Sequence, residues 1–220
     1  MNAAVLIPAL NAAASLPVLL ERTLNFVSRD RIFIINDGSL DATKSAAEQF
    51  GVNVISHERN RGKGAALQTG FDAVLSGGFP AVITMDADLQ HRPEEIPNFI
   101  TFHSLTRNDV IIGSRLHNTM QMPFHRILSN TMTSVLVRMR TGAAISDSQS
   151  GFRFIMRNVL EQVRLEADGF EAETEFLIKA AARGFTFGSI PIDAIYAGER
   201  SHMTHVQTTV NFIKVLLKQY

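Results

Sequence analysis

Residues 31–56 read RIFIINDGSLDATKSAAEQFGVNVIS, and this stretch decides the fold class. The apolar run within Arg31–Asn36 is typical of a strand that is buried on both faces. The next five residues, DGSLD, predict a turn in which Ser39 or Asp41 can cap the following helix. A second apolar run follows at Val52–Ser56. A strand, a helix and another strand in this order predict two parallel strands joined by a helix.

The same alternation continues on both sides of this unit. Further buried strands are expected at Ala3–Ala9, Ala81–Met85 and Val110–Ile112, and another strand is expected at Thr186–Ile192. Helices are expected near Leu16–Val27, Gly64–Ser76, Pro93–His103, Phe124–Met139, Glu171–Arg183 and Val206–Lys218. This pattern predicts an α/β fold with a mostly parallel central sheet flanked by helices. No repeat or linker interrupts the chain, so residues 1–220 are expected to form a single domain.

The composition excludes several classes of protein. The chain has 220 residues, 45% of them apolar, and its 21 Lys and Arg residues balance 21 Asp and Glu residues. Zero formal charge argues against a nucleic-acid partner, and the absence of Cys excludes disulfides and thiol chemistry. The charge-free stretch Met1–Leu20 contains two prolines and lacks a basic start, so neither a transmembrane helix nor a secretion signal is expected. We expect a cytoplasmic protein; the oligomeric state stays open.

Acidic residues stand where strands are expected to end, and Asp86 and Asp88 are the strongest chemical signal among them. In open α/β sheets, ligands bind beyond the carboxyl ends of the strands. Two carboxylates one residue apart repel each other there, and a divalent cation, Mg²⁺ or Mn²⁺, relieves that repulsion. Gln90 adds a carbonyl oxygen on the same side. These three residues form the predicted metal site; the alternative is that one aspartate only caps the helix near Pro93.

Other residues near strand ends would suit a nucleotide. Asp37 could accept a hydrogen bond from the edge of a base, and Asn11 could offer its amide to a base or a ribose. The sequence Arg61-Gly62-Lys63-Gly64 precedes a predicted helix start, where backbone N–H groups and Lys63 could meet phosphate. Each segment also has a plainer explanation, because Asp-Gly-Ser is ordinary turn sequence and Arg-Gly-Lys-Gly is not a P-loop.

Three arginines are candidates for pairing with phosphate, since a guanidinium fork matches phosphate oxygens. They are Arg115, Arg126 and Arg153. For Arg126 the alternative is a solvated flank of a helix. The segment Ser146–Arg153 has many small polar residues before an apolar stretch, which indicates a loop shaped under a ligand, with an ordinary turn as the alternative.

Seven motifs have an order and spacing that occur together in one family of enzymes. They are Ile7–Asn11, Asn36–Ser39, Asn60–Gly64, Asp86–Gln90, Gly113–Arg115, Asp147–Arg153 and Gly169–Glu171. In this combination the chain resembles the family 2 glycosyltransferases, in the branch that includes dolichyl-phosphate mannose synthase and bacterial polyprenyl-phosphate sugar transferases. The resemblance implies a GT-A fold, a nucleotide-sugar donor and a divalent cation held at the Asp-x-Asp motif.

The resemblance also implies where the donor binds. It places Pro8, Asn11, Asp37, Asp86, Ala87, Asp88 and Arg115 at the donor, and the phosphate-facing position of Lys63 adds that residue to the set. Residues 1–115 would then form the half that binds the nucleotide-sugar, and residues 116–220 the half that faces the acceptor.

The chain departs from the family pattern at several positions. Ala12 stands where the family has an acidic residue, and Asn36 where it has an aspartate. Close to Tyr196, where the family has other basic residues, the chain offers Arg200 and His202 as donor-side cations. These departures leave the base and the sugar of the donor open.

We expect inverting transfer of the sugar to a lipid-linked polyprenyl phosphate. A cation at Asp88, together with Arg115, would neutralise the charge that builds up on the leaving diphosphate. A phosphate acceptor is already an anion and needs only positioning. Arg126, Ser129 and Arg153 are the candidates for that role.

Other reactions remain possible on the same residues. A hydroxyl acceptor would need a base, and Asp147 is the best-placed carboxylate for it. A phosphatase with an aspartyl nucleophile would have threonine in place of Gln90, and a nucleotidyltransferase would release pyrophosphate. A non-catalytic nucleotide-binding module is the remote alternative, suggested by Ala12.

Two predicted helices carry apolar stripes with basic edges. Arginines flank the stripe of Phe124–Met139, and lysines flank that of Val206–Lys218. Such faces suit a membrane interface, and would make the protein peripheral on the inner face of a membrane; packing against the core is the alternative. The glutamates within 171–175 are expected to form mostly a solvated helix face, and His202 is the one histidine with an expected role.

Overall fold

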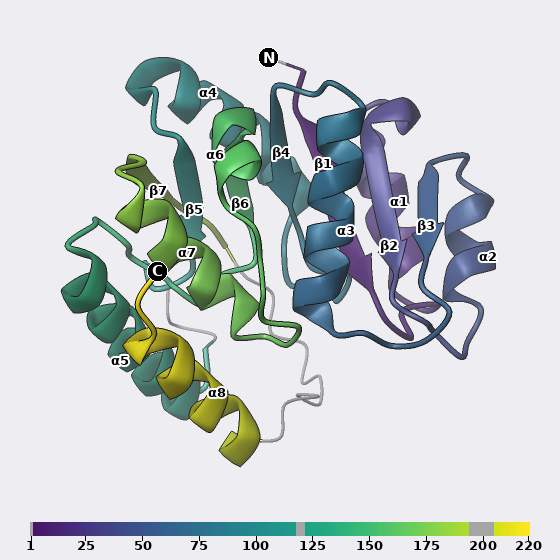
Figure 1. Cartoon of the computed structure of the whole chain (residues 1–220). Helices are drawn as coiled ribbons and strands as arrows, with labels where there is room; N and C mark the ends of the chain where they lie inside the picture. The colour runs from purple at the N-terminus through teal and green to yellow at the C-terminus, as the bar shows by residue number, and fades with distance from the viewer. Residues whose placement is uncertain (1, 118–121, 194–204) are drawn as a thin grey trace.

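The computed structural model describes residues 2–117, 122–193 and 205–220, and its centre is a seven-stranded sheet with helices on both faces (Figure 1). The strands are β1 (Ala4–Ala9), β2 (Ile32–Asn36), β3 (Asn53–Ser56), β4 (Ala81–Thr84), β5 (Val110–Ser114), β6 (Arg153–Met156) and β7 (Phe187–Pro191). Their order is β3-β2-β1-β4-β6-β5-β7, and every pair is parallel except those that β6 makes. The expected α/β fold is confirmed.

The helices cover the sheet in two layers. They are α1 (Leu16–Thr23), α2 (Thr43–Glu48), α3 (Lys63–Ser76), α4 (Ile96–Thr106), α5 (Phe124–Thr141), α6 (Arg157–Gln162), α7 (Ala172–Ala182) and α8 (His205–Leu217), with 3₁₀ turns η1 (Arg29–Arg31) and η2 (Pro93–Glu95). Side chains of α1, α2 and α4 pack on one face of the sheet, and those of α3, α6 and α7 on the other. No helix in the described residues is long and apolar enough to cross a bilayer.

Burial on both faces explains the continuous apolar runs of the strands. Successive residues of a strand point to opposite faces. In β1, Val5 and Ile7 belong to the core beneath α1 and α4, whereas Ala4 and Leu6 belong to the core beneath α3. A strand of this kind has no solvent face, so alternation with polar residues disappears from its sequence.

The strand β6 and the helix α6 were not predicted from the sequence. β6 lies antiparallel between β4 and β5, with Arg153 opposite both Thr84 and Ile112. Its reversed direction places the start of β6 beside the carboxyl ends of its two neighbours. The segment that precedes it, 147–152, therefore lies at the same edge of the sheet as Asp86 and Arg115.

Candidate active site

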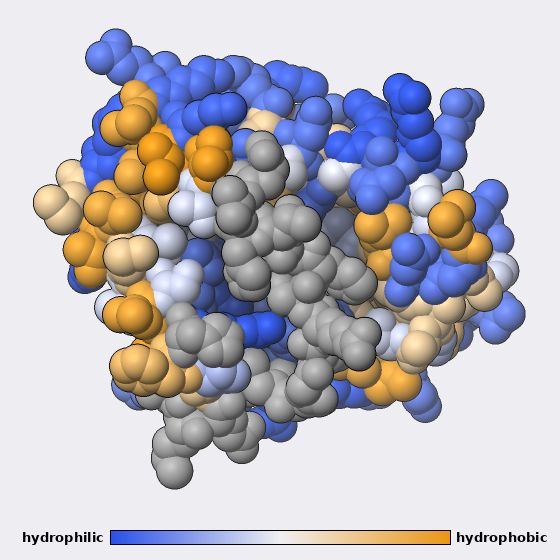
Figure 2. All heavy atoms as spheres, turned by 90° about the horizontal axis from the view of Figure 1, so that it is seen from below, coloured by the Kyte–Doolittle hydropathy of each residue, from blue (hydrophilic) through white to orange (hydrophobic). Residues whose placement is uncertain are grey.

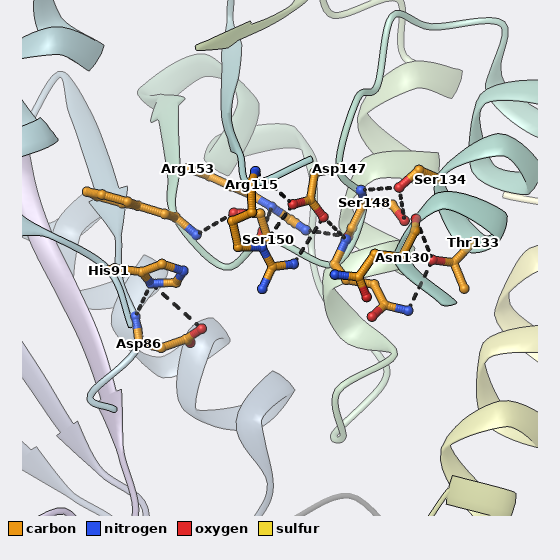
Figure 3. Close-up of polar contacts among 12 residues, drawn as sticks. Asp86, His91, Arg115, Asn130, Thr133, Ser134, Asp147, Ser148, Ser150 and Arg153 are labelled. Carbon is orange, nitrogen blue, oxygen red and sulfur yellow. Dashed lines mark hydrogen bonds and ion pairs between the residues drawn. The ribbon is translucent and has the colours of Figure 1, made fainter. Parts of the chain in front are cut away.

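The site is a set of polar contacts at the carboxyl edge of β4 and β5. Figure 3 shows these contacts extending from Asp86 and His91, past Arg115 and Asp147, to the α5 residue Ser134. Asp86 lies two residues after β4 and Arg115 follows β5 directly, so the two strands that flank β6 deliver an acidic and a basic side chain to one edge of the sheet.

Lys63 lies between two carboxylates. Its Nζ is 2.5 Å from Asp86 Oδ1 and 2.9 Å from Glu173 Oε1. Lys63 begins α3 and Glu173 lies in the first turn of α7, so three segments that are distant in sequence meet at this ammonium. Gly151 lies against the cluster, where a Cβ atom would be only 2.7 Å from Asp86 Oδ2. A side chain at this position would collide with the carboxylates, which explains the glycine.

The charges of this cluster reinforce one another. Burial by itself lowers the pKa of Lys63 and raises that of Asp86, because it disfavours their charged forms. The Coulombic attractions and hydrogen bonds within the cluster together outweigh burial: they raise the pKa of Lys63 above its usual range and hold the pKa of Asp86 well below its own. Both side chains are therefore charged at neutral pH.

His91 supports the backbone at Asp86 and was not predicted to have a role. Its Nδ1 accepts the backbone N–H of Asp86 at 3.1 Å, and its ring stacks on Phe152 with 5.1 Å between centroids. Burial lowers the pKa of His91 to about 4, against the attraction of the Asp86 carboxylate. The ring is thus neutral at neutral pH, and Nδ1 can act as the acceptor because the proton is on Nε2.

The depressed pKa of His91 predicts a loss of stability on mild acidification. The unfolded side chain titrates near 6.5 and the folded one near 4, so between these values the unfolded state binds more protons. The free energy of unfolding should fall by about 1.4 kcal/mol per pH unit in that window. Urea unfolding at several pH values, in chelator, should show a shallower pH dependence for His91→Asn, which keeps an acceptor near Nδ1. The exposed control His117→Asn should retain the wild-type slope; equal slopes for all three proteins would contradict this assignment.

The residues after β4 fit a divalent cation as part of a larger site. Asp86 and Asp88 supply carboxylate oxygens and Gln90 an amide oxygen, which suit Mg²⁺ or Mn²⁺. Asp88 Oδ1 accepts the backbone N–H of Gln90 at 3.0 Å, across a turn in which Leu89 has a φ of +64°. In the described ranges, no three carboxylate or imidazole groups are arranged to hold a metal. A cation at these residues would need further ligands from a bound molecule.

Asp147 and Arg115 form a two-pronged ion pair. Arg115 Nε is 2.9 Å from Asp147 Oδ2 and Nη2 is 3.0 Å from Oδ1, and the backbone N–H of Arg115 also donates to Oδ2. Asp147 is fully buried. Burial would raise its pKa, but the attraction of the Arg115 guanidinium holds that pKa below its usual range. These contacts favour a positioning role for Asp147 over the role of a general base.

The position of Arg153 corrects the expectation that it binds an acceptor phosphate. The side chain is 3% exposed, and its guanidinium donates to the backbone carbonyls of Ser150, Glu173 and Ser148 at 2.7, 2.9 and 2.9 Å. Arg153 therefore ties the loop before β6 to α7.

The turn after β2 is held by its own side chains. The buried carboxylate of Asp37 accepts the backbone N–H groups of Arg61 and Gly62 at 2.9 and 2.8 Å, and lies 2.6 Å from His57 Nδ1. These contacts fix the loop that leads to Lys63. Asn11 Oδ1 accepts the backbone N–H of Leu40 at 2.9 Å. Turn chemistry thus accounts for the side chain of Asp37 and for Asn11 Oδ1.

The remaining predicted residues lie in several places. Pro8 is half-buried in β1 and Ala87 is buried beside Asp86. Arg126 is half-buried in the first turn of α5, and Ser129 is exposed on the same helix. Arg200 and His202, like Tyr196, lie outside the described residues.

The glutamates of α7 were expected in solvent, and this expectation was wrong for two of them. Glu173 is 8% and Glu175 is 1% exposed. Glu175 accepts the backbone N–H groups of Glu166 and Ala167 and is 2.9 Å from Lys179 Nζ. A sequence signal existed, because apolar residues surround these glutamates on every side of a short helix, as in a buried helix whose charges are paired.

Comparison with known proteins identifies the family. Residues 4–164 match the Glycosyl transferase family 2. The chain is 29% identical over 200 residues to the polyprenol monophosphomannose synthase of Mycolicibacterium smegmatis, a match that covers 86% of this chain and 75% of the relative. It is also 29% identical over 213 residues to the UDP-N-acetylglucosamine–dolichyl-phosphate N-acetylglucosaminyltransferase of Methanococcus voltae, covering 87% and 84%.

A solved structure shows the same fold. The glucosyl-3-phosphoglycerate synthase of Mycobacterium tuberculosis, crystallised with Mn²⁺, UDP and glucosyl-3-phosphoglycerate, superposes with a TM-score of 0.75 at 20% identity over 98% of this chain and 78% of the other. The fold is accordingly GT-A. This chain is a glycosyltransferase that belongs to glycosyl transferase family 2, in the branch that contains the two polyprenyl-phosphate and dolichyl-phosphate sugar transferases named above.

Proposed function

We propose that this enzyme transfers a sugar, with inversion, from a nucleoside-diphosphate sugar to a polyprenyl phosphate, assisted by Mg²⁺ or Mn²⁺. The observation that carries the proposal is the Lys63–Asp86–Glu173 cluster beside the Arg115–Asp147 pair at the carboxyl edge of the sheet. The names of the two relatives support a lipid-phosphate acceptor, and the Mn²⁺ and UDP in the similar structure support the cation and the donor class.

The cation would be held by Asp86, Asp88 and Gln90, and when bound it supplies positive charge to the donor diphosphate. Lys63 and Arg115 stand beside this position, so they can bind and orient phosphate oxygens and stabilise negative charge on the leaving group. Residues 1–115 would carry most donor contacts, with Pro8, Asn11 and Ala87 lining the entrance. The ion pair between Lys63 and Glu173 adds a residue of the second half to the donor side.

The state of Asp147 favours a phosphate acceptor over a hydroxyl acceptor. A hydroxyl group must lose its proton during transfer, which calls for a base with a suitable pKa and an accessible oxygen. Asp147 is fully buried, its two oxygens accept hydrogen bonds from Arg115, and its pKa is depressed. A phosphate acceptor needs no such base, and Arg126 and Ser129 on the second half remain the candidates to position it at a cytoplasmic membrane surface.

Product analysis tests this proposal. The enzyme is incubated with UDP-, GDP- and dTDP-sugars, Mg²⁺ or Mn²⁺, and a short-chain polyprenyl phosphate, and nucleotides and lipids are separated. We expect one nucleoside diphosphate and a glycosylated lipid phosphate, and a loss of about 100-fold or more in Asp88→Ala if the cation neutralises the leaving group. The exposed Asp30→Ala is the matched control. Pyrophosphate release, transfer to saccharide alone, or no reaction would each contradict the proposal.

Thermal unfolding provides the binding measurement. A donor at about 100 times its Kd adds roughly 2.7 kcal/mol to the free energy of unfolding, which is about 5–11 °C in Tm for a domain of this size. The shift should require the cation and should disappear in Asp88→Ala. A shift that persists without cation in the presence of chelator would overturn the metal assignment while leaving donor binding in place.

A further inference from the structure

The helix α5 turns its apolar side outward. Six of its large apolar side chains are between 37% and 78% exposed: Phe124, Leu128, Met132, Val135, Leu136 and Met139. The opposite side of the helix is buried and mostly polar: Asn130, Thr133 and Ser134 are each less than 9% exposed, and they lie on the same side as the buried Val137. In an ordinary surface helix the apolar stripe faces the core. Core packing therefore does not explain the stripe of α5.

Hydrogen bonds to the loop before β6 set this orientation. Ser134 Oγ accepts the backbone N–H of Ser148 at 2.9 Å, and Gln149 Nε2 donates to Thr133 Oγ1 at 3.0 Å. Figure 3 shows these α5 side chains pointing toward the loop that carries Asp147. Because the polar side of α5 is bound to the site, its apolar side has to face away from the molecule.

The helix α8 extends the same surface. Val210, Ile213 and Leu217 are 42%, 47% and 74% exposed, while Val215 is buried. α5 and α8 lie side by side at the lower left of Figure 1, where the Arg140 guanidinium donates to the carbonyls of Leu216 and Lys218. Seen from below in Figure 2, hydrophobic residues gather along this left side, next to a hydrophilic hollow.

The charge of the two helices indicates what covers this surface. Neither α5 nor α8 contains an Asp or Glu, although acidic and basic residues balance in the whole chain. Exposed Arg138, Arg140 and Lys214 lie beside the apolar side chains. Apolar residues with basic neighbours match a bilayer with anionic headgroups, in which apolar side chains enter the acyl boundary and cations meet phosphates. A second copy of this chain fits the surface less well. In a symmetric dimer the same face of both copies would meet, which would bring the positively charged arginines together.

We propose that the outward face of α5 and α8, here called the docking face, attaches this protein to an anionic lipid bilayer. The proposal deepens and rests on the proposed function, because the bilayer is where a polyprenyl phosphate resides. The buried side of α5 contacts the loop 148–149, so only the width of one helix, about 10 Å, separates the docking face from the loop that holds Asp147. Docking would bring a lipid-borne phosphate group close to Arg115.

Vesicle flotation tests the docking face. Wild type is mixed with vesicles of phosphatidylcholine alone or with phosphatidylglycerol, and compared with the double variant Leu128→Asp/Met132→Asp. Both side chains are more than half exposed, so the variant should fold normally. Wild type should float with the anionic vesicles, and the variant should bind them about tenfold more weakly or worse. The control Leu40→Asp/Leu105→Asp alters two exposed leucines outside the two helices and should bind like wild type.

The outcomes separate this proposal from the proposed function. No flotation of wild type, equal flotation of wild type and variant, or a wild-type dimer that the variant dissociates in light scattering would each overturn docking to lipid. The variant should still transfer sugar to a short-chain, water-soluble polyprenyl phosphate, because the changed residues lie on the exposed side of α5 and not on the side that contacts residues 148–149. If vesicles bind as expected but no transfer occurs with any donor, the proposed function fails while the docking face stands.

Discussion

Replacing Lys63 by methionine is expected to lower the free energy of unfolding by about 3–5 kcal/mol, the usual effect of removing one partner from a buried ion pair. The ammonium lies 2.5 Å from Asp86 Oδ1 and 2.9 Å from Glu173 Oε1. Methionine keeps the length of the side chain but removes its charge, so two carboxylates face each other without a cation. Urea unfolding of wild type and Lys63→Met in chelator measures the difference.

Two controls define what the loss means. Lys44→Met removes an exposed lysine whose Nζ is 3.8 Å from Glu48, and should change stability by less than about 0.5 kcal/mol. Lys63→Met/Glu173→Gln removes the repulsion together with the ammonium and should recover part of the loss. If Lys63→Met behaved like Lys44→Met, the cluster would carry no electrostatic stabilisation.

Wild type and Lys63→Met should also differ in how much an added divalent cation raises their Tm. In Lys63→Met, the carboxylates of Asp86 and Glu173 have lost their ammonium, so Mn²⁺ or Mg²⁺ can take over its charge. The rise in Tm on adding Mn²⁺ should therefore be larger for Lys63→Met than for wild type. An equal rise in both proteins would show that the cation binds away from this cluster.

The strands could be predicted because their sequence reflects burial on both faces. Arg31–Asn36 and Ala81–Met85 are apolar runs between turn residues, and both became inner strands of the sheet. β6 could not be predicted in this way. Its four residues include Arg153, and they form a strand only because β4 and β5 supply hydrogen-bond partners from distant parts of the sequence. The reversed direction of β6 is likewise a property of the sheet.

The residue types that form the site could be predicted from the sequence, but the burial of their side chains could not. The spacing of Asp86 and Asp88 after a strand indicates their place at the sheet edge, and the structure has Asp86 there. Whether a charged residue binds a ligand or a neighbour depends on what covers it. Asp147 and Glu173 are covered by elements distant in sequence, so their ion pairs to Arg115 and Lys63 become visible only in three dimensions.

The orientation of α5 shows a related limit. Its sequence has an apolar side and a polar side, and helical periodicity identifies both without saying which one faces the core. The orientation follows from hydrogen bonds of Thr133 and Ser134 to Gln149 and Ser148, which no periodicity reports.

Substitution of Asp147 by asparagine is expected to lower kcat/KM by about 100- to 1000-fold, the range found when a charge-stabilising group is lost. The physical reason is the loss of the hydrogen bonds that orient the guanidinium of Arg115. Asparagine presents an N–H₂ group where the guanidinium needs a second acceptor, so the two-pronged contact at 2.9 and 3.0 Å is broken. Asp147→Ala should also lower the free energy of unfolding by about 3–5 kcal/mol, because it removes one partner of a largely buried ion pair.

A double-mutant cycle with Arg115→Met decides between positioning and base catalysis. If Asp147 acts only through Arg115, either single variant already loses the same interaction with the leaving group, and the double variant should be no slower than the slower single variant. A general base would act on the acceptor, independently of Arg115, so the two effects would multiply. It would also give wild type an acidic limb in the pH profile of kcat/KM that Asp147→Asn lacks. If the effects of the two substitutions on kcat/KM multiply, and if the acidic limb is lost in Asp147→Asn, a hydroxyl acceptor with Asp147 as its base would be the better hypothesis for this site.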